Sequence, residues 1–105
     1  MKIEKIRCHP QTFGEVNKKY CDLKQSIKDK LEGHFDGEIN LSIKLYLLRS
    51  RAEKSDLDNY LKAIIDAINE GHVINKESQI GSIFIKRIKV DSPEEEGVEI
   101  EITSV

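Results

Sequence analysis

Acidic and cationic side chains gather around one predicted helix start in this chain. Asp56 and Asp58 lie two positions apart, and Lys62 follows Asp58 by four residues. Residues four apart share a helix face, so Asp58 and Lys62 should lie side by side. Asp66 continues this face by one more turn, where its simplest role is an ion pair with Lys62. Carboxylate oxygens are the ligands that hard divalent cations prefer, so the spacing indicates a metal ion beside an ammonium group.

A second polar group, Lys76-Glu77-Ser78-Gln79, lies between the end of this helix and the next predicted strand. At that point the chain can return beside the helix start and bring Glu77 to the two aspartates. The simpler interpretation is that Ser55 and the first acids cap the helix, each contributing ~0.3–1 kcal/mol. Capping does not account for Lys62 or for Glu77, and we therefore favour the metal site.

The length and composition of the chain indicate one globular domain. Its 105 residues are enough for a single core. Hydrophobic residues make up 38% of the chain and charged residues 34%, which is typical of a folded protein with a solvated surface. The net charge of -2 does not indicate nucleic-acid binding by the molecule as a whole, so such binding would depend on local basic groups. We expect a single domain over residues 1–105.

The cysteines and the N-terminus indicate a cytoplasmic protein. Cys8 and Cys21 have no paired spacing, and the first residues lack the apolar segment of a secretory signal. We expect no contact with a membrane, because no apolar run approaches the ~20 residues that cross a bilayer. His72 suits a helix end better than the role of general base. The short spacings of zinc ligands are missing from the remaining candidate set, which comprises Cys8, His9, Cys21 and His34.

Hydrophobic periodicity predicts two helices and about four strands. The first helix should begin near Thr12, where Thr12-Phe13-Gly14-Glu15 has the spacing of a capping box, and end near Gly33. The second should begin near Ser55 or Asp56 and end at Gly71. Its predicted buried stripe consists of Leu57, Leu61, Ile64, Ile65 and Ile68. The predicted strands cover residues 1–8 at a sheet edge, 38–47, 80–90 and 98–102.

The order of these elements predicts the fold class. The turn over residues 91–96 should join the last two strands as a hairpin. Helices interleaved with strands before a terminal hairpin indicate a small α+β domain. We expect a mixed four-stranded sheet with both helices packed on it, in the order β-α-β-α-β-β.

Two separated motifs resemble the RusA family of Holliday junction resolvases. Residues 56–69 read Asp-Leu-Asp-Asn-Tyr-Leu-Lys-Ala-Ile-Ile-Asp-Ala-Ile-Asn, and Glu77-Ser78-Gln79-Ile80 follows. The family reads D-x-D-N-x-x-K-x-x-x-D-x-L at the helix and usually D-D-S-Q-[IV] before the next strand. The resemblance covers roughly residues 38–103, and it is specific because both motifs occur in the right order at a compatible separation.

The resemblance implies a RusA-like fold and a crossover junction endodeoxyribonuclease of DNA recombination and repair. Such proteins are homodimers, are commonly encoded by prophages, and nick four-way DNA junctions symmetrically with Mg²⁺, for which Mn²⁺ can substitute. Carried over by position, Asp56, Asp58 and Glu77 would bind the metal, and Lys62 would be the essential amine of the same catalytic set. The metal would bind phosphate and generate hydroxide from water, which is compatible with phosphodiester hydrolysis.

The sequence departs from the family pattern in two places. Lys76-Glu77 replaces the usual acidic pair, so the carboxylate sits one methylene further from the backbone. A longer ligand can lower the rate or favour Mn²⁺, because Mg²⁺ demands near-ideal octahedral geometry. The basic first strand of many relatives is reduced here to Lys5, Arg7 and His9-Pro10.

Contacts to DNA phosphates are expected from basic residues near the acids. The candidates are Arg49, Arg51, Lys54 and Lys76. Lys86, Arg87 and Lys89 are more simply explained as surface charges. Two alternatives stay open from the sequence: a catalytically silent module that binds junctions, and a nuclease for other branched DNA.

Overall fold

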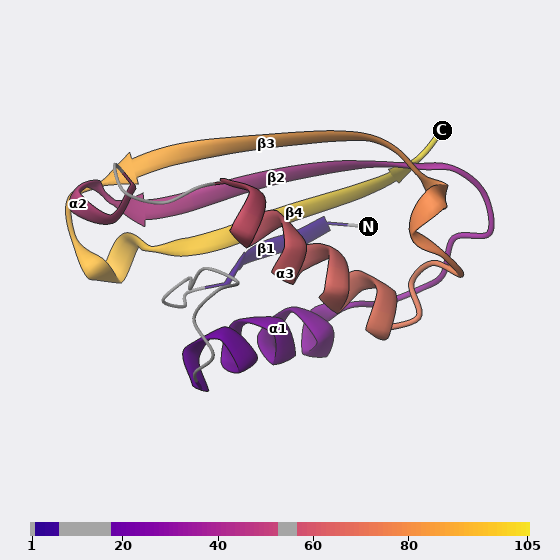
Figure 1. The fold of residues 1–105 in the computed structure, drawn as a ribbon, viewed down its shortest axis with the longest axis horizontal. Helices are drawn as coiled ribbons and strands as arrows, with labels where there is room; N and C mark the ends of the chain where they lie inside the picture. Colours follow the sequence, from indigo (N-terminus) through magenta and orange to yellow (C-terminus); the bar gives the residue numbers. More distant parts are fainter. Residues whose placement is uncertain (1, 7–17, 53–56) are drawn as a thin grey trace.

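The computed structural model describes residues 2–6, 18–52 and 57–105 of the chain (Figure 1). Four strands form one sheet in the order β1-β4-β2-β3. The α+β class with a mixed sheet is confirmed. The elements are β1 (Lys2–Ile6), α1 (Lys18–Lys30), β2 (Ile39–Leu48), α2 (Arg49–Ala52), α3 (Leu57–Glu70), η1 (Glu77–Gln79), β3 (Ile80–Val90), η2 (Pro93–Glu95) and β4 (Gly97–Ser104). The two predicted helix starts, at Thr12 and at Ser55 or Asp56, lie outside the described residues.

Strand β2 supplies the centre of the core. Its side chains alternate between the helix side and the open side, as a strand with one buried face requires. The buried set, each 1% exposed or less, is Ile39, Leu41, Ile43, Leu45 and Leu47. Figure 1 shows α3 crossing in front of the sheet with α1 beside it. The other face of the sheet therefore carries the polar residues of β2.

The predicted hairpin of the last two strands is wrong. β4 pairs antiparallel with both β1 and β2, and β3 pairs in parallel with β2. Strand β2 thus lies between β3 and β4 (Figure 1). The apolar residues of β4 explain its inner position, because Val98, Ile100 and Ile102 are at most 1% exposed. In β3, by contrast, Ile83 and Phe84 are 42% and 60% exposed, as suits the edge strand of the described sheet.

The connection between β3 and β4 has the length that this crossing needs. A tight hairpin uses about two loop residues. Here residues 91–96 pass the end of β2, and the carboxylate of Glu96 accepts a hydrogen bond from the backbone N–H of Leu48 at 3.0 Å. Glu96 is 1% exposed, so this contact ties the connection to the end of β2 from inside. The length of the polar segment over residues 91–96 is therefore the sequence feature that argues against a tight hairpin.

Helix α3 is rotated from the predicted orientation. Ile64 and Ile68 are buried as expected, but Leu57, Leu61 and Ile65 are only partly buried. Fully buried positions that the prediction missed are Tyr60, Ala63 and Ala67. Tyr60 and Ala67 belong to the same buried core cluster as the apolar residues of β2. The rotation leaves Leu61 and Ile65 at the margin of the core, next to the predicted functional face.

In the described part of the chain, no helix has the length and apolar character needed to cross a membrane.

Candidate metal and DNA site

The solvent-facing side of α3 borders a hollow of about 240 Å³. Asp58, Lys62 and Asp66 line it at intervals of four residues, which places them on one helix face. Asp58 and Lys62 are exposed, and Asp66 is partly buried. Eight residues of helix separate Asp58 from Asp66, about 12 Å along the axis, so the hollow is elongated.

Glu77 reaches the same hollow from a different element. It is the first residue of η1, the single turn between α3 and β3. The chain returns to this point through Val73 and Ile74, which are buried at 1% and 2% exposure and anchor the loop in the core. The structure thus brings Glu77 to a hollow that Asp58 also lines. The predicted approach of Glu77 to Asp56 stays a prediction, because Asp56 lies outside the described residues.

Apolar side chains form the wall between these charges. Leu61 and Ile65 line the hollow and pack against the core at the same time. Such a wall lowers the local dielectric, so an ion or phosphate in the hollow interacts more strongly with the charged groups than it would in bulk water. Leu61 and Ile65 lie beside the hollow because α3 is rotated from the orientation that the periodicity predicts.

The chemistry of the donors suits a hard divalent cation. Asp58, Asp66 and Glu77 offer only carboxylate oxygens, the ligand type of Mg²⁺. Within the described ranges, however, no three His, Cys, Asp or Glu side chains lie close enough together to hold a metal ion. The third predicted acid, Asp56, falls outside those ranges. The described residues therefore supply only part of a set of metal ligands. Within that part, Asp58 precedes Glu77 along the chain, as the two motifs predict.

Asp66 was left out of the metal set in the sequence prediction, and the structure places it in the wall of the hollow. The signal was present, because Asp66 continues the four-residue spacing of Asp58 and Lys62. Asp66 differs from Asp58 and Lys62 in being partly buried, whereas those two residues are exposed.

The predicted DNA contacts are distributed over both ends of β2 and β3. Arg49 is exposed at the start of α2, with its Nε 3.3 Å from the carboxylate of Asp91. Lys76 is exposed beside Glu77. Arg51 belongs to α2, but the structure does not describe its side chain. Lys54 lies outside the described residues.

Arg87 has a structural contact that the surface-charge interpretation did not predict. Its Nη1 donates a hydrogen bond to the carbonyl oxygen of Ala52 at 2.8 Å. This bond ties the last residue of α2 to β3, immediately before the segment that contains Asp56.

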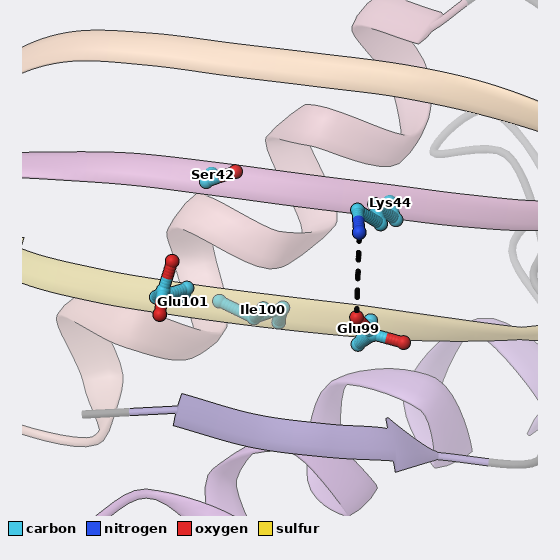
Figure 2. A pocket seen from close by; sticks show the side chains of 5 residues that line it. All are labelled: Ser42, Lys44, Glu99, Ile100 and Glu101. Atoms are coloured by element: carbon cyan, nitrogen blue, oxygen red, sulfur yellow. Dashed lines mark ion pairs between the residues drawn. The ribbon is translucent and has the colours of Figure 1, made fainter.

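Figure 2 shows a second, smaller hollow on the open face of the sheet, about 70 Å³ in volume. Ser42 and Lys44 project from β2, and Glu99 and Glu101 from β4. The Nζ of Lys44 lies 3.9 Å from a carboxylate oxygen of Glu99, and the hydroxyl of Tyr46 donates to the other at 3.0 Å. Desolvation and this carboxylate raise the pKa of Tyr46. These groups satisfy one another across neighbouring strands, so the hollow beside α3 is the better candidate site.

Comparison with known proteins identifies the family. A model described as endodeoxyribonuclease RusA matches residues 11–103, which is most of the 105-residue chain. The chain therefore belongs to the endodeoxyribonuclease RusA family. Membership implies an endonuclease that acts on branched DNA, at Holliday junctions. The comparison with curated proteins gave no match.

Proposed function

We propose that this protein is a metal-dependent endodeoxyribonuclease that resolves four-way DNA junctions by paired, symmetric nicks. The observation that carries the proposal is the hollow beside α3. Asp58 and Lys62 from the helix and Glu77 from a separate turn line that hollow together. These three residues occupy motif positions of the endodeoxyribonuclease RusA family, to which the chain belongs.

The carboxylates of Asp58 and Glu77, together with Asp56, hold a Mg²⁺ ion in this proposal, and Mn²⁺ can replace it. Bound there, the metal supplies a Lewis acid for the phosphate and a hydroxide from water. Asp58 sits in the first turn of α3, near the end of the helix where negatively charged groups interact favourably with the helix dipole. Glu77 is exposed and therefore free to reach toward a ligand in the hollow.

Lys62 acts on the phosphate in this proposal. Its ammonium group lies one turn from Asp58 in the same hollow, so a phosphate bound there is within its field. The cation offsets the charge that develops on the nonbridging oxygens as water attacks phosphorus and the bond to the leaving 3′ oxygen breaks. The apolar wall of Leu61 and Ile65 strengthens this interaction.

The DNA is held by phosphate contacts from Arg49, Arg51, Lys54 and Lys76. Lys76 adjoins Glu77, and Arg49 lies at the opposite end of the parallel β2–β3 pair. Such contacts grip the backbone without reading sequence. A two-fold homodimer presents two copies of the site to opposed strands, and this symmetry accounts for paired nicks.

Cleavage of a synthetic four-way junction tests the proposal. The purified protein is expected to nick two opposed strands at symmetric positions with Mg²⁺ or Mn²⁺. Asp58→Asn is expected to lower the cleavage rate by at least about a hundredfold, since a direct ligand should matter at least as much as the groups that orient ligands. Junction binding, measured without a catalytic metal, should remain within about twofold of wild type, because phosphate contacts dominate that affinity.

The matched control is Asp29→Asn, which makes the same charge change on the exposed side of α1. It should cut junctions as wild type does. Junctions left intact by wild type with both metals would contradict the proposal, and nicks confined to one strand would contradict the paired mechanism.

A second candidate is a catalytically silent module that binds junctions. Lys76 favours it, because this cation stands where relatives usually carry one of two acids. A silent module would bind junctions with an affinity that neither divalent metal nor Asp56→Asn changes, and it would cut none. Calorimetry with and without metal separates the two functions.

A further inference from the structure

Gln79 is one of the two polar residues among the buried side chains of the described chain, with 7% of its surface exposed. It ends the η1 turn that begins with Glu77. Burial of an amide is costly unless its donors and acceptors are paired. The contacts of Gln79 therefore indicate what this residue does in the fold.

All the hydrogen-bonding capacity of the Gln79 amide is used on backbone groups. Its Oε1 accepts from the N–H of Asn75 at 2.6 Å and from the N–H of Lys76 at 3.1 Å. Its Nε2 donates to the carbonyl oxygens of Phe35 at 2.8 Å and Gly37 at 2.9 Å. A primary amide offers two donors and two acceptor positions, so this side chain is matched to the four groups around it.

These bonds join two loops that are far apart in the sequence. One loop leads from α1 into β2, and the other leads from α3 through η1 into β3. Two further bonds reinforce the junction: the N–H of Phe35 donates to the carbonyl of Val73 at 2.7 Å, and Nδ1 of His34 donates to the carbonyl of His72 at 2.7 Å. Gln79 provides the part of this junction that lies closest to Glu77.

The backbone on both sides of Glu77 is fixed by Gln79. Before Glu77, the amides of Asn75 and Lys76 are bound to the side chain of Gln79. After it, the backbone N–H of Gln79 itself donates to the carbonyl of Lys76 at 3.1 Å. The side chain of Glu77 is exposed, so packing does not hold it. The position of its carboxylate in the hollow therefore depends on how firmly the turn is held.

We infer that Gln79 is a positioning residue, which holds the η1 turn so that Glu77 reaches the hollow beside α3 as a metal ligand. The inference rests on the proposed function, because it assigns Glu77 to the metal. Glu77 has one more rotatable bond than an aspartate, so a fixed backbone matters more here. Loss of a group that orients a metal ligand typically raises the dissociation constant of the metal by ~10–100-fold.

The first test is a Mn²⁺ titration of the full-length protein by calorimetry. Gln79→Glu keeps the shape of the side chain but turns both donors into acceptors that face the carbonyls of Phe35 and Gly37. At pH 8 we expect the dissociation constant for Mn²⁺ to rise by about tenfold or more, although the added negative charge alone would attract the cation.

The matched control is Gln25→Glu, which makes the same substitution on the exposed surface of α1. It should bind Mn²⁺ as wild type does at pH 8. If Gln79→Glu lowers the melting temperature but binds Mn²⁺ with wild-type affinity, Gln79 only stabilises the fold and the inference is overturned.

Amide hydrogen exchange of the metal-free protein provides a readout that does not depend on the proposed function. In Gln79→Glu or Gln79→Leu, the amides of residues 75–78 should exchange at least about tenfold faster than in wild type, while those inside β2 keep their protection. Unchanged exchange at residues 75–78 would overturn the inference. If wild type binds no Mn²⁺, the proposed metal site fails, and the exchange rates alone decide whether Gln79 holds the turn.

Discussion

Glu77 is exposed, and it is one methylene longer than the aspartate that is usual at this motif position. Mg²⁺ tolerates little departure from octahedral geometry, with ligand distances of ~2.0–2.1 Å. The η1 turn, which carries Glu77, must therefore accommodate the extra methylene of this side chain. In the proposed site, we therefore expect the choice of metal to depend on the length of this side chain.

Glu77→Asp tests the effect of that length. We expect the substitution to raise the rate of junction cleavage with Mg²⁺ relative to the rate with Mn²⁺, by about twofold to tenfold, because the shorter ligand restores the geometry that Mg²⁺ demands. The measurement is the ratio of the two initial rates on one junction. Glu95→Asp, an exposed change in η2, is the control. A ratio that stays at or falls below the wild-type value would show that the length of Glu77 does not set the metal preference.

The sequence predicted the residues of the site better than it predicted their surroundings. Asp58, Lys62 and Glu77 carry motif spacing, and the structure places all three in one hollow. The apolar wall was not predicted, because Leu61 and Ile65 fit the period of a buried stripe as well as Ile64 does. Tertiary packing decides which side of the helix is buried, and in the structure that side carries Tyr60, Ala63 and Ala67 as well as Ile64 and Ile68. Asp56 stays a prediction.

At the scale of elements, α1 supports α3 through polar contacts as well as apolar ones. The Nζ of Lys24 lies 2.5 Å from one carboxylate oxygen of Glu70, and the Nζ of Lys28 lies 3.4 Å from the other. These contacts, the bond from Lys24 first, lower the pKa of Glu70. The pair of lysines thus holds the C-terminal end of α3, just before the loop that leads to Glu77.

This pKa shift predicts a pH-dependent contribution to stability. Because the folded state lowers the pKa of Glu70 below its ordinary value of 4.5, the stabilisation is present above that pH and is lost as pH falls through the folded pKa. Glu70→Gln should therefore lower the melting temperature by a few degrees at most near pH 7, since exposed pairs contribute little. The difference from wild type should shrink as pH falls below 4.5 and through the lowered pKa of Glu70.

Thermal unfolding followed by circular dichroism measures this effect. Glu95→Gln removes the same charge in η2, away from α1 and α3, and should show no such pH dependence. A Glu70→Gln difference that persists unchanged at pH 3 would mean that the two lysines are not its source.

Local periodicity predicted β2 and β3 close to their observed limits and α3 close to its observed end, but it did not predict the order of the strands. Alternation along residues 39–48 identifies a strand whatever its neighbours are. The place of β4 depends on competition for the centre of the sheet, and its three fully buried apolar residues take that place ahead of β3. Such a comparison between distant segments is not contained in the pattern of either one.

For the molecule as a whole, the layout of the sheet relates the site to the substrate. The long axis measures 39 Å, and the parallel pair β2–β3 runs along it with α2 at one end and η1 at the other (Figure 1). Arg49 and Lys76 therefore lie toward opposite ends, with the hollow beside α3 between them. Because the net charge is -2, we expect DNA binding to depend on local basic groups such as these and to weaken as salt increases.

The central claim is that Asp58 and Glu77, from two elements, bind one metal ion in the hollow beside α3. A crystal of the protein soaked with Mn²⁺ tests it most directly, through the anomalous scattering of the metal. We predict one strong peak within coordination distance of both carboxylates, and its loss in Asp58→Asn. The absence of a peak in the hollow, or a peak held by Asp66 without Asp58 and Glu77, would contradict the account.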